Sequence, residues 1–170
     1  MCGILVSFNN TYKKEILDKC LHLMDHRGPD YSNSIIGDDY YFGHNRLSII
    51  DLNPRSNQPF EKASHIMVYN GEVYNYLELI KEHHLSVETT SDTEVVLEMY
   101  IKYKEKCLQY FNGMFAFIIF NKKTKDTFIA RDRLGIKPLY YYNSGNKNIF
   151  SSEIASILNI VNDGFDEFGI

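Results

Sequence analysis

The chain begins Met1-Cys2-Gly3-Ile4-Leu5-Val6-Ser7-Phe8, and almost every residue from Cys2 to Phe8 is apolar or small. A short apolar run of this length is typical of a strand buried in a sheet. The next segment, Lys13–Asp25, has the spacing of a helix with one apolar face. That face consists of Ile16, Leu17, Cys20, Leu21 and Met24. The chain is therefore predicted to open with a buried strand and a helix that can cover it.

Three pairs of strand-like segments follow, and a short polar turn separates the members of each pair. The pairs are Tyr31–Ile36 with Tyr40–Leu47, Met114–Phe120 with Thr127–Arg131, and Leu139–Tyr142 with Asn148–Ser151. Strands joined by short turns form hairpins, and hairpins build antiparallel sheets.

The middle of the chain is predicted to hold one more strand and two helices. The strand covers Ile66–Tyr69 and ends at the turn signal Asn70-Gly71. A short helix covers Tyr74–His84, and Ser91-Asp92-Thr93-Glu94 has the pattern of a capping box that opens a helix over Thr93–Lys104. A last helix covers Glu153–Asn159. Because helices and sheets must cover each other's apolar faces, we expect a layered α+β fold.

Composition excludes several classes of protein. The 170 residues are 44% hydrophobic and 24% charged, as in an ordinary globular domain. The 18 basic and 22 acidic side chains give a formal charge of −4, which argues against a nucleic-acid partner. The sequence has no apolar stretch long enough for a membrane span. Its three cysteines and six histidines follow no disulfide or metal-ligand spacing, so we expect no metal and a cytoplasmic location.

Cys2 is the first candidate for catalysis. A cysteine entering a buried strand is usually only a small apolar residue. Removal of Met1 would, however, place a thiol and a free amine on the same residue. The α-amino group has a pKa of about 7.7–8.0, which suits a general base near neutral pH. Such a residue carries its own nucleophile and base, the principle of N-terminal nucleophiles.

The start Met1-Cys2-Gly3-Ile4 resembles the class II glutamine amidotransferases, a branch of the N-terminal nucleophile hydrolases. Further blocks match this family in order from Cys2 to about Leu158. They are His26–Asp30, Gly43–Asp51, Tyr69–Asn75, Ser91–Glu94, Phe111–Phe117, Ala130–Tyr141 and Ser152–Ile154. Pro29-Asp30 and the run Lys137–Tyr141 resemble the asparagine synthetase branch. The resemblance implies an αββα sandwich of two mainly antiparallel sheets between helices.

The resemblance also implies catalytic roles. The Cys2 thiolate would attack the side-chain carboxamide of L-glutamine and form a γ-glutamyl thioester, which water then hydrolyses. A tetrahedral oxyanion needs donors that are already in place. The side chain of Asn70 and the backbone N–H of Gly71 would supply them. From the residues alone, Asn70-Gly71 could equally be a tight turn.

Four residues would bind the amino-acid head group of glutamine. Arg46 would hold the α-carboxylate, since a guanidinium can bind a carboxylate with two hydrogen bonds. Glu72 and Asp92 would accept hydrogen bonds from the α-ammonium, and backbone groups near Ile50 would touch the head group. Other interpretations stay open: Arg46 as a surface arginine, and Asp92 as a helix cap.

Several other residues of the matched blocks have structural or undecided roles. Arg27 either orients the N-terminus or forms an ion pair with Asp30. Cys20 is predicted to lie in the core, and Arg131-Asp132-Arg133 to be charged scaffold.

Residues 1–158 are expected to form the glutaminase domain, and residues 159–170 a tail leading toward a synthetase domain. In the resembling proteins that domain uses ATP and Mg²⁺ to make asparagine from aspartate with the released ammonia. Its Ser-Gly-Gly-rich loop does not occur in these residues, so we expect no cofactor for them. Two alternatives remain: a glutaminase serving another acceptor, and a glutamine-binding module without catalysis. The resemblance leaves a homodimer open.

Overall fold

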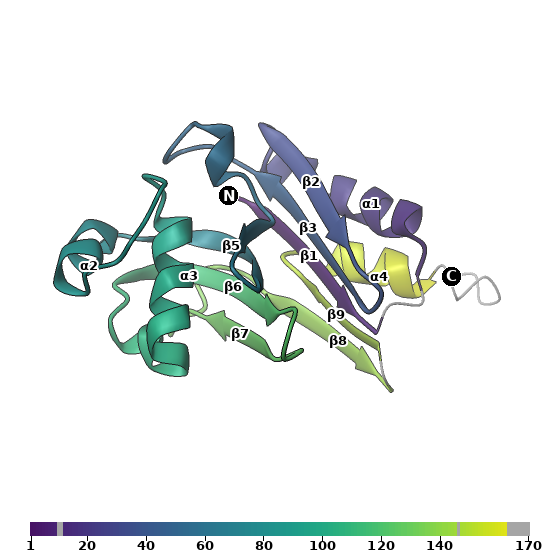
Figure 1. The fold of residues 1–170 in the computed structure, drawn as a ribbon. Helices are drawn as coiled ribbons and strands as arrows, with labels where there is room; N and C mark the ends of the chain where they lie inside the picture. Colours follow the sequence, from purple (N-terminus) through teal and green to yellow (C-terminus); the bar gives the residue numbers. More distant parts are fainter. Residues whose placement is uncertain (10–11, 146, 163–170) are drawn as a thin grey trace. The chain divides into compact units, whose positions relative to one another are not determined.

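The fold consists of two units, each built on one antiparallel sheet (Figure 1). A computed structural model describes residues 1–9, 12–145 and 147–162. The first unit contains Met1–Leu47 and the chain from Pro138 onward, and the second contains Ser48–Lys137.

The sheet of the first unit has five strands in the order β2-β3-β1-β9-β8. They are β1 (Gly3–Phe8), β2 (Tyr31–Ile36), β3 (Tyr40–Arg46), β8 (Tyr140–Ser144) and β9 (Lys147–Ser151). The strand nearest the N-terminus, β1, is central and pairs antiparallel with β3 and with β9. The apolar character of Cys2–Phe8 fits this central place, because a central strand is covered along its length.

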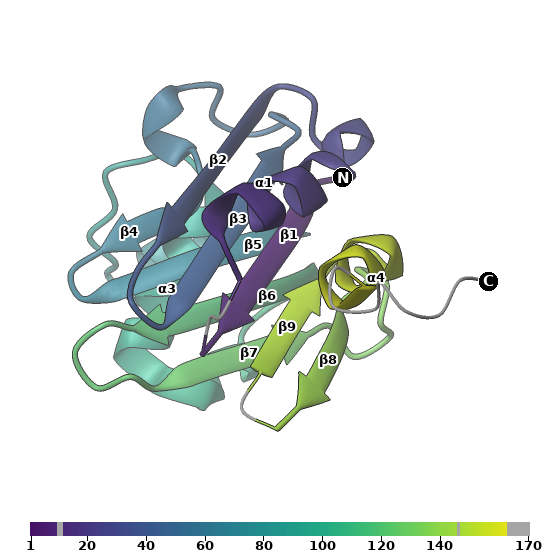
Figure 2. The same cartoon turned by 90° about the vertical axis from the view of Figure 1, so that its right-hand side faces the viewer.

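Two helices cover one face of this sheet, α1 (Lys14–His22) and α4 (Ile154–Asn162), and Figure 2 shows them on the same side. The core beneath them consists of Leu5, Leu17, Cys20, Leu21, Met24, Tyr41, Ile149, Ile157 and Ile160. A 3₁₀ turn over Asp25–Arg27 follows α1. The prediction that Cys20 is a core residue is confirmed, since its exposure is 4%.

The sheet of the second unit has four strands in the order β4-β5-β6-β7. They are β4 (Phe60–Lys62), β5 (His65–Val73), β6 (Gly113–Asn121) and β7 (Thr127–Arg131). The long helix α3 (Asp92–Tyr103) packs on one face of this sheet, and the shorter α2 (Tyr76–Glu82) packs beside it (Figure 1). The core between α3 and the sheet includes Met67, Tyr69, Val95, Val96, Met99, Phe115, Phe117 and Ile119. Short 3₁₀ turns cover Pro54–Ser56 and Lys104–Gln109.

The predicted turn at Asn70-Gly71 is wrong. Strand β5 continues through both residues to Val73, with Asn70 opposite Ala116 and Gly71 opposite Phe115. Glycine is needed here for close packing, because a Cβ on Gly71 would lie 2.5 Å from the carbonyl oxygen of Met114. Nine paired residues along β5 and β6 outweigh the local preference of an Asn-Gly pair for a turn.

The predicted capping box is also wrong, although its helix is confirmed. Ser91 is the N-cap and accepts a hydrogen bond from the backbone of Thr93. The carboxylate of Glu94 instead binds the backbone N–H groups of Glu88 and Thr89 and pairs with Lys62. A tertiary ion pair thus takes the place of the local bond.

Element ends differ from prediction by a few residues, and β4 was not predicted. Helix α1 ends at His22 rather than Asp25, because the chain tightens into the 3₁₀ turn. Helix α4 continues to Asn162, so it enters the predicted tail of residues 159–170. The rest of that tail lies outside the described residues.

Asp132 organises the loop that follows β7. Its Oδ1 accepts hydrogen bonds from the backbone of Leu134 and Ile136, and its Oδ2 from Phe115 and Lys137. Burial alone would raise the pKa of this carboxyl, but the four backbone donors outweigh burial and hold the pKa below its ordinary value. The prediction that this charged segment is scaffold is confirmed for Asp132.

Replacing Asp132 by asparagine is expected to lower the free energy of unfolding at pH 7 by about 1–3 kcal/mol. The amide NH₂ would leave two backbone N–H groups facing another donor. Because the folded-state pKa of Asp132 is depressed, its stabilisation is present above the unfolded pKa of about 3.9 and lost as pH falls through the folded value. Urea unfolding at several pH values should show the difference between wild type and Asp132→Asn shrinking below about pH 4. A difference that grew in acid would contradict this account.

Candidate active site

Cys2 and Arg46 lie together at one end of the first unit's sheet. Gly3 pairs with Asn45, so the next position along this register sets Cys2 opposite Arg46. Residues directly opposite each other in an antiparallel pair point to the same face. Gly3 and Asn45 face α1, since a Cβ on Gly3 would lie 3.1 Å from Met24 and Asn45 donates to Leu21. Arg46 therefore points to the opposite face, and Cys2 is the residue that precedes β1 at the same end.

The Cys2 side chain is half-buried, and its Sγ lies 3.9 Å from the carbonyl oxygen of Leu47. Arg46 is 5% exposed at the end of β3. The alternative that Arg46 is an ordinary surface arginine is therefore wrong. A half-buried cysteine and a buried cation thus occupy neighbouring positions at one end of the sheet.

Arg27 binds the backbone of Cys2. Its Nε donates to the Cys2 carbonyl oxygen at 3.0 Å, and its Nη1 pairs with Glu153 at 3.1 Å. The proposed ion pair with Asp30 is thus replaced by one with Glu153, and the alternative that Arg27 orients the N-terminus is favoured. Gly28 lets the segment that carries Arg27 pack closely against β3, because a Cβ on Gly28 would lie 2.3 Å from the backbone of Asn45.

Asn70 lies in β5 of the second unit and is 1% exposed. Its Nδ2 is buried, with no hydrogen-bond partner among the residues that the structure describes. Leaving a buried donor unpaired costs about 1–3 kcal/mol, so it needs an explanation. Tyr69 and Val73 pack under α3, and side chains alternate along a strand. Asn70 and Glu72 therefore share the face of the sheet that points away from α3, with the backbone of Gly71 between them.

Asp92 is the first residue of α3 and joins that helix to β5. Its Oδ2 accepts hydrogen bonds from the Tyr69 hydroxyl at 2.6 Å and from the Val73 backbone at 3.0 Å. The N-cap itself is Ser91, so the capping role considered for Asp92 belongs to its neighbour. Burial raises the pKa of the Asp92 carboxyl and the negative charge of Glu72 raises it further, more than these hydrogen bonds lower it. A cation near Asp92 and Glu72 would relieve this cost.

Ile50 is half-buried in the segment that precedes the 3₁₀ turn at Pro54–Ser56. The next residue, Asp51, holds this segment by accepting hydrogen bonds from Ser56 and from the backbone of Thr90. Burial opposes ionisation of Asp51, but the hydrogen bonds outweigh it and place the pKa well below the usual range. Asp51 and Glu153 were part of the matched sequence blocks, yet their contacts could not be predicted from spacing.

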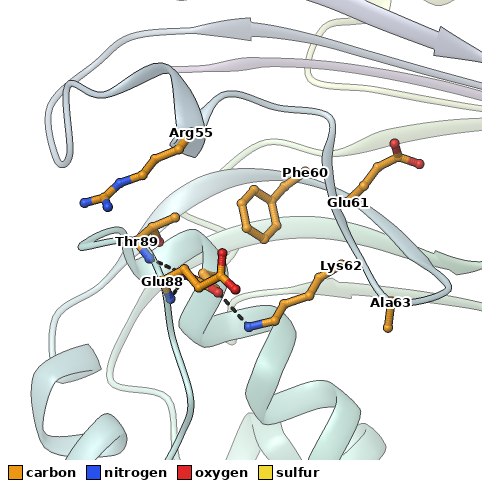
Figure 3. A pocket seen from close by; sticks show the side chains of 8 residues that line it. Arg55, Phe60, Glu61, Lys62, Ala63, Glu88 and Thr89 are labelled. Carbon is orange, nitrogen blue, oxygen red and sulfur yellow. Dashed lines mark hydrogen bonds and ion pairs between the residues drawn. The ribbon is translucent and has the colours of Figure 1, made fainter.

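The second unit also has a pocket of about 370 Å³, shown in Figure 3. Its eight lining residues are Arg55, Phe60, Glu61, Lys62, Ala63, Glu88, Thr89 and Glu94, and none is a predicted site residue. Two of these residues, Lys62 and Glu94, form an ion pair at 2.6 Å. Because none of the predicted site residues lines it, this pocket is not the predicted glutamine site.

The described residues contain no group of three or more His, Cys, Asp or Glu side chains that could hold a metal ion. None of their helices is both long enough and apolar enough to cross a bilayer.

The strand that begins next to Cys2 is thus the central strand of its sheet, in a fold with two antiparallel sheets and helices. Residues 1–167 match the glutamine amidotransferase domain family, and the chain belongs to it. The α+β class is confirmed by a solved glutamine phosphoribosylpyrophosphate amidotransferase from Bacillus subtilis. The match has a TM-score of 0.77 at 18% identity and covers 94% of this chain and 44% of the other.

Among curated proteins, the chain is similar to a putative glutamine-hydrolysing asparagine synthetase of Methanocaldococcus jannaschii. The two are 43% identical over 93% of this chain and 35% of the relative. Glutamine-hydrolysing asparagine synthetase 3 of Bacillus subtilis is 39% identical over 93% and 27%. The amidase chry2 of Gibberella zeae is 39% identical over 85% and 22%. The chain thus spans about a third or less of the length of these relatives.

Asp92→Asn is expected to be at least as stable as wild type at pH 7. Because the folded-state pKa of Asp92 is raised, ionisation costs stability above that pKa, and the cost disappears as pH falls below the unfolded value of about 3.9. Asparagine removes the charge and can still accept from Tyr69 and Val73. Urea unfolding at pH 7 and pH 4 should show a relative gain at pH 7 that shrinks in acid, opposite to Asp132→Asn. A loss of 1 kcal/mol or more at pH 7, roughly one hydrogen bond, would refute this explanation.

Proposed function

We propose that this domain hydrolyses L-glutamine to glutamate and ammonia at Cys2, and that the ammonia serves ATP-dependent asparagine synthesis by a synthetase domain. The observation that carries the proposal is the place of Cys2, half-buried next to the central strand of its unit, beside Arg46 and bound through its carbonyl by Arg27. Membership of the glutamine amidotransferase family supports the same chemistry.

In the proposed mechanism, Met1 is removed, and the α-amine of Cys2 takes the proton of the thiol. The thiolate then attacks the carboxamide carbon of glutamine. Collapse of the tetrahedral intermediate breaks the C–N bond, and the amine returns the proton to the departing ammonia. Water attacks the resulting thioester, releases glutamate and restores the thiol. An amine with a pKa near neutral can serve in both directions.

The oxyanion formed in these steps is assigned to Asn70 and Gly71. The Nδ2 of Asn70 is a buried donor without a described partner, which is what a site awaiting a transient anion requires. Because Asn70 lies within a paired strand, its backbone is fixed before the reaction begins.

The head group of glutamine is assigned to residues of matching charge. Arg46 binds the α-carboxylate, Glu72 and Asp92 bind the α-ammonium, and the backbone near Ile50 completes the contacts. The raised pKa of Asp92 supports this assignment, since a bound ammonium would offset the burial of the carboxylate.

The proposed acceptor of the ammonia is inferred from the names of the similar proteins. Two are named as glutamine-hydrolysing asparagine synthetases and extend well beyond the matched region, which supports residues 1–158 as their glutaminase part. A relative named as an amidase, chry2, supports a second candidate in which the ammonia goes to another acceptor. Sequence outside these residues would decide between the two acceptors.

Protein lacking Met1 is expected to release glutamate from glutamine, whereas Cys2→Ala should lose activity by a factor on the order of 10³ or more. Loss of the thiol removes the bond-forming atom itself. A coupled glutamate assay measures this, with intact mass confirming removal of Met1. Protein that retains Met1 is the matched control, since it keeps the thiol but carries the amine on another residue. Activity that survives Cys2→Ala would end the proposal.

Asn70→Ala is expected to lower kcat by about 10²–10³-fold, the usual loss for one oxyanion donor. Its thermal stability should hold, because the Asn70 amide donates to no described residue. Asn75→Ala is the matched control: Asn75 donates to Tyr110 and accepts from Asn112, so its loss should lower stability and leave kcat intact. A folded Asn70→Ala protein with wild-type kcat would show that the donor is not used.

A further inference from the structure

The segment Ser151–Glu153, where β9 ends, holds the first residues of the chain in place. The pairing of β1 with β9 reaches Leu5 and Ser151. Beyond it, the hydroxyl of Ser152 accepts from the Ile4 backbone at 3.0 Å, and the Ser152 N–H donates to the Ile4 carbonyl oxygen at 3.0 Å. Both backbone groups of Ile4 are therefore bound by one residue that is distant in sequence.

Glu153 extends this attachment to Cys2 through Arg27. Its Oε1 accepts from Arg27 Nη1 at 3.1 Å and from His26 Nε2 at 2.9 Å. The Glu153 N–H donates to the hydroxyl of Ser151 at 3.2 Å, which fixes its backbone. Arg27 in turn donates from Nε to the Cys2 carbonyl oxygen.

Arg27 links Glu153 to Cys2, and we call these two contacts the relay. Its side chain is only 9% exposed, so water competes little for the guanidinium. The group is planar and rigid, so the direction in which Glu153 holds Nη1 also sets the direction of Nε. Hydrogen bonds between charged partners are stronger than those between neutral ones, so the ion pair with Glu153 favours one orientation of the Arg27 guanidinium.

We propose that Glu153 is a positioning residue for the nucleophile, acting through Arg27 on the carbonyl of Cys2. The inference rests on the proposed role of Cys2. Fixing that carbonyl limits rotation about the Cα–C bond of Cys2 and thereby directs its thiol and its amine. Terminal residues are otherwise poorly ordered, and an N-terminal catalyst must counter that tendency.

The relay touches the nucleophile and none of the residues assigned to the glutamine head group. Losing it should therefore misplace the thiol and amine without weakening the grip on substrate. The predicted signature is a fall in kcat with KM unchanged, and a slower reaction of Cys2 with a small electrophile that needs no substrate site. A purely structural ion pair would change stability alone.

The test compares Glu153→Ala, Glu153→Gln and wild type, all with Met1 removed. Misplacing a reacting group costs about 10- to 100-fold, so Glu153→Ala should lose that much in kcat and react more slowly with iodoacetamide at Cys2, followed by mass spectrometry. Glu153→Gln, which can still accept both hydrogen bonds, should recover most of the rate. Asp18→Ala is the matched control, because Asp18 pairs with Lys14 in the same unit on the helix side of the sheet.

Two results would overturn the proposal: wild-type kcat and alkylation rate in Glu153→Ala, or an equal loss of kcat in Asp18→Ala. Failure of the proposed function is distinguishable. If wild-type protein hydrolyses no glutamine, that function falls, while the alkylation rates of Cys2 still decide whether Glu153 positions it.

Discussion

The central position of β1 is the constraint on which the rest of the first unit depends. A chain end is normally loose, yet β1 begins at Gly3 and has a hydrogen-bonded neighbour on each side. Those neighbours come from far along the sequence, since Leu5 lies opposite both Gly43 and Ser151. The end of the first unit must therefore return to the sheet before the second residue of the chain is held. Order at Cys2 is thus a tertiary property, and local sequence does not provide it.

Polar groups in the second unit are held at a cost to stability. The amide of Asn70, which has no hydrogen-bond partner among the described residues, and the buried carboxyl of Asp92, whose pKa is raised, each oppose folding. The pairing of β5 with β6 and the core beneath α3 offset these costs. Asp132 in the same unit shows the opposite solution, since four backbone donors surround a carboxylate that has only a structural task. The contrast distinguishes polar groups that the described residues leave costly from a carboxylate that they fully satisfy.

Much of the fold could be predicted because local sequence patterns determine many of its strands and helices. The hairpins of Tyr31–Ile36 with Tyr40–Leu47 and of Met114–Phe120 with Thr127–Arg131 agree with the structure to within a residue or so, since alternation and turns fix them. The turn predicted at Asn70-Gly71 does not form, because β5 stays paired with β6 through both residues. The predicted capping box does not form, because the Glu94 side chain pairs with Lys62 instead. The candidate site residues were predicted from sequence blocks that match the family in order along the chain. The contact of Glu153 with Arg27 joins positions far apart in the sequence, and no local pattern predicts it.

Under the proposed assignment, charge would favour glutamine over an amide lacking its head group. The α-carbon of glutamine carries one anion and one cation, and the chain supplies a buried cation at Arg46 and two carboxylates at Glu72 and Asp92. Burial and the charge of Glu72 raise the pKa of Asp92, so in the proposed site a ligand without an ammonium would do nothing to stabilise its carboxylate. A ligand with the ammonium would place a cation beside these carboxylates and offset that cost. Under the proposed assignment, selectivity would therefore come from the matching charge of the ligand's head group.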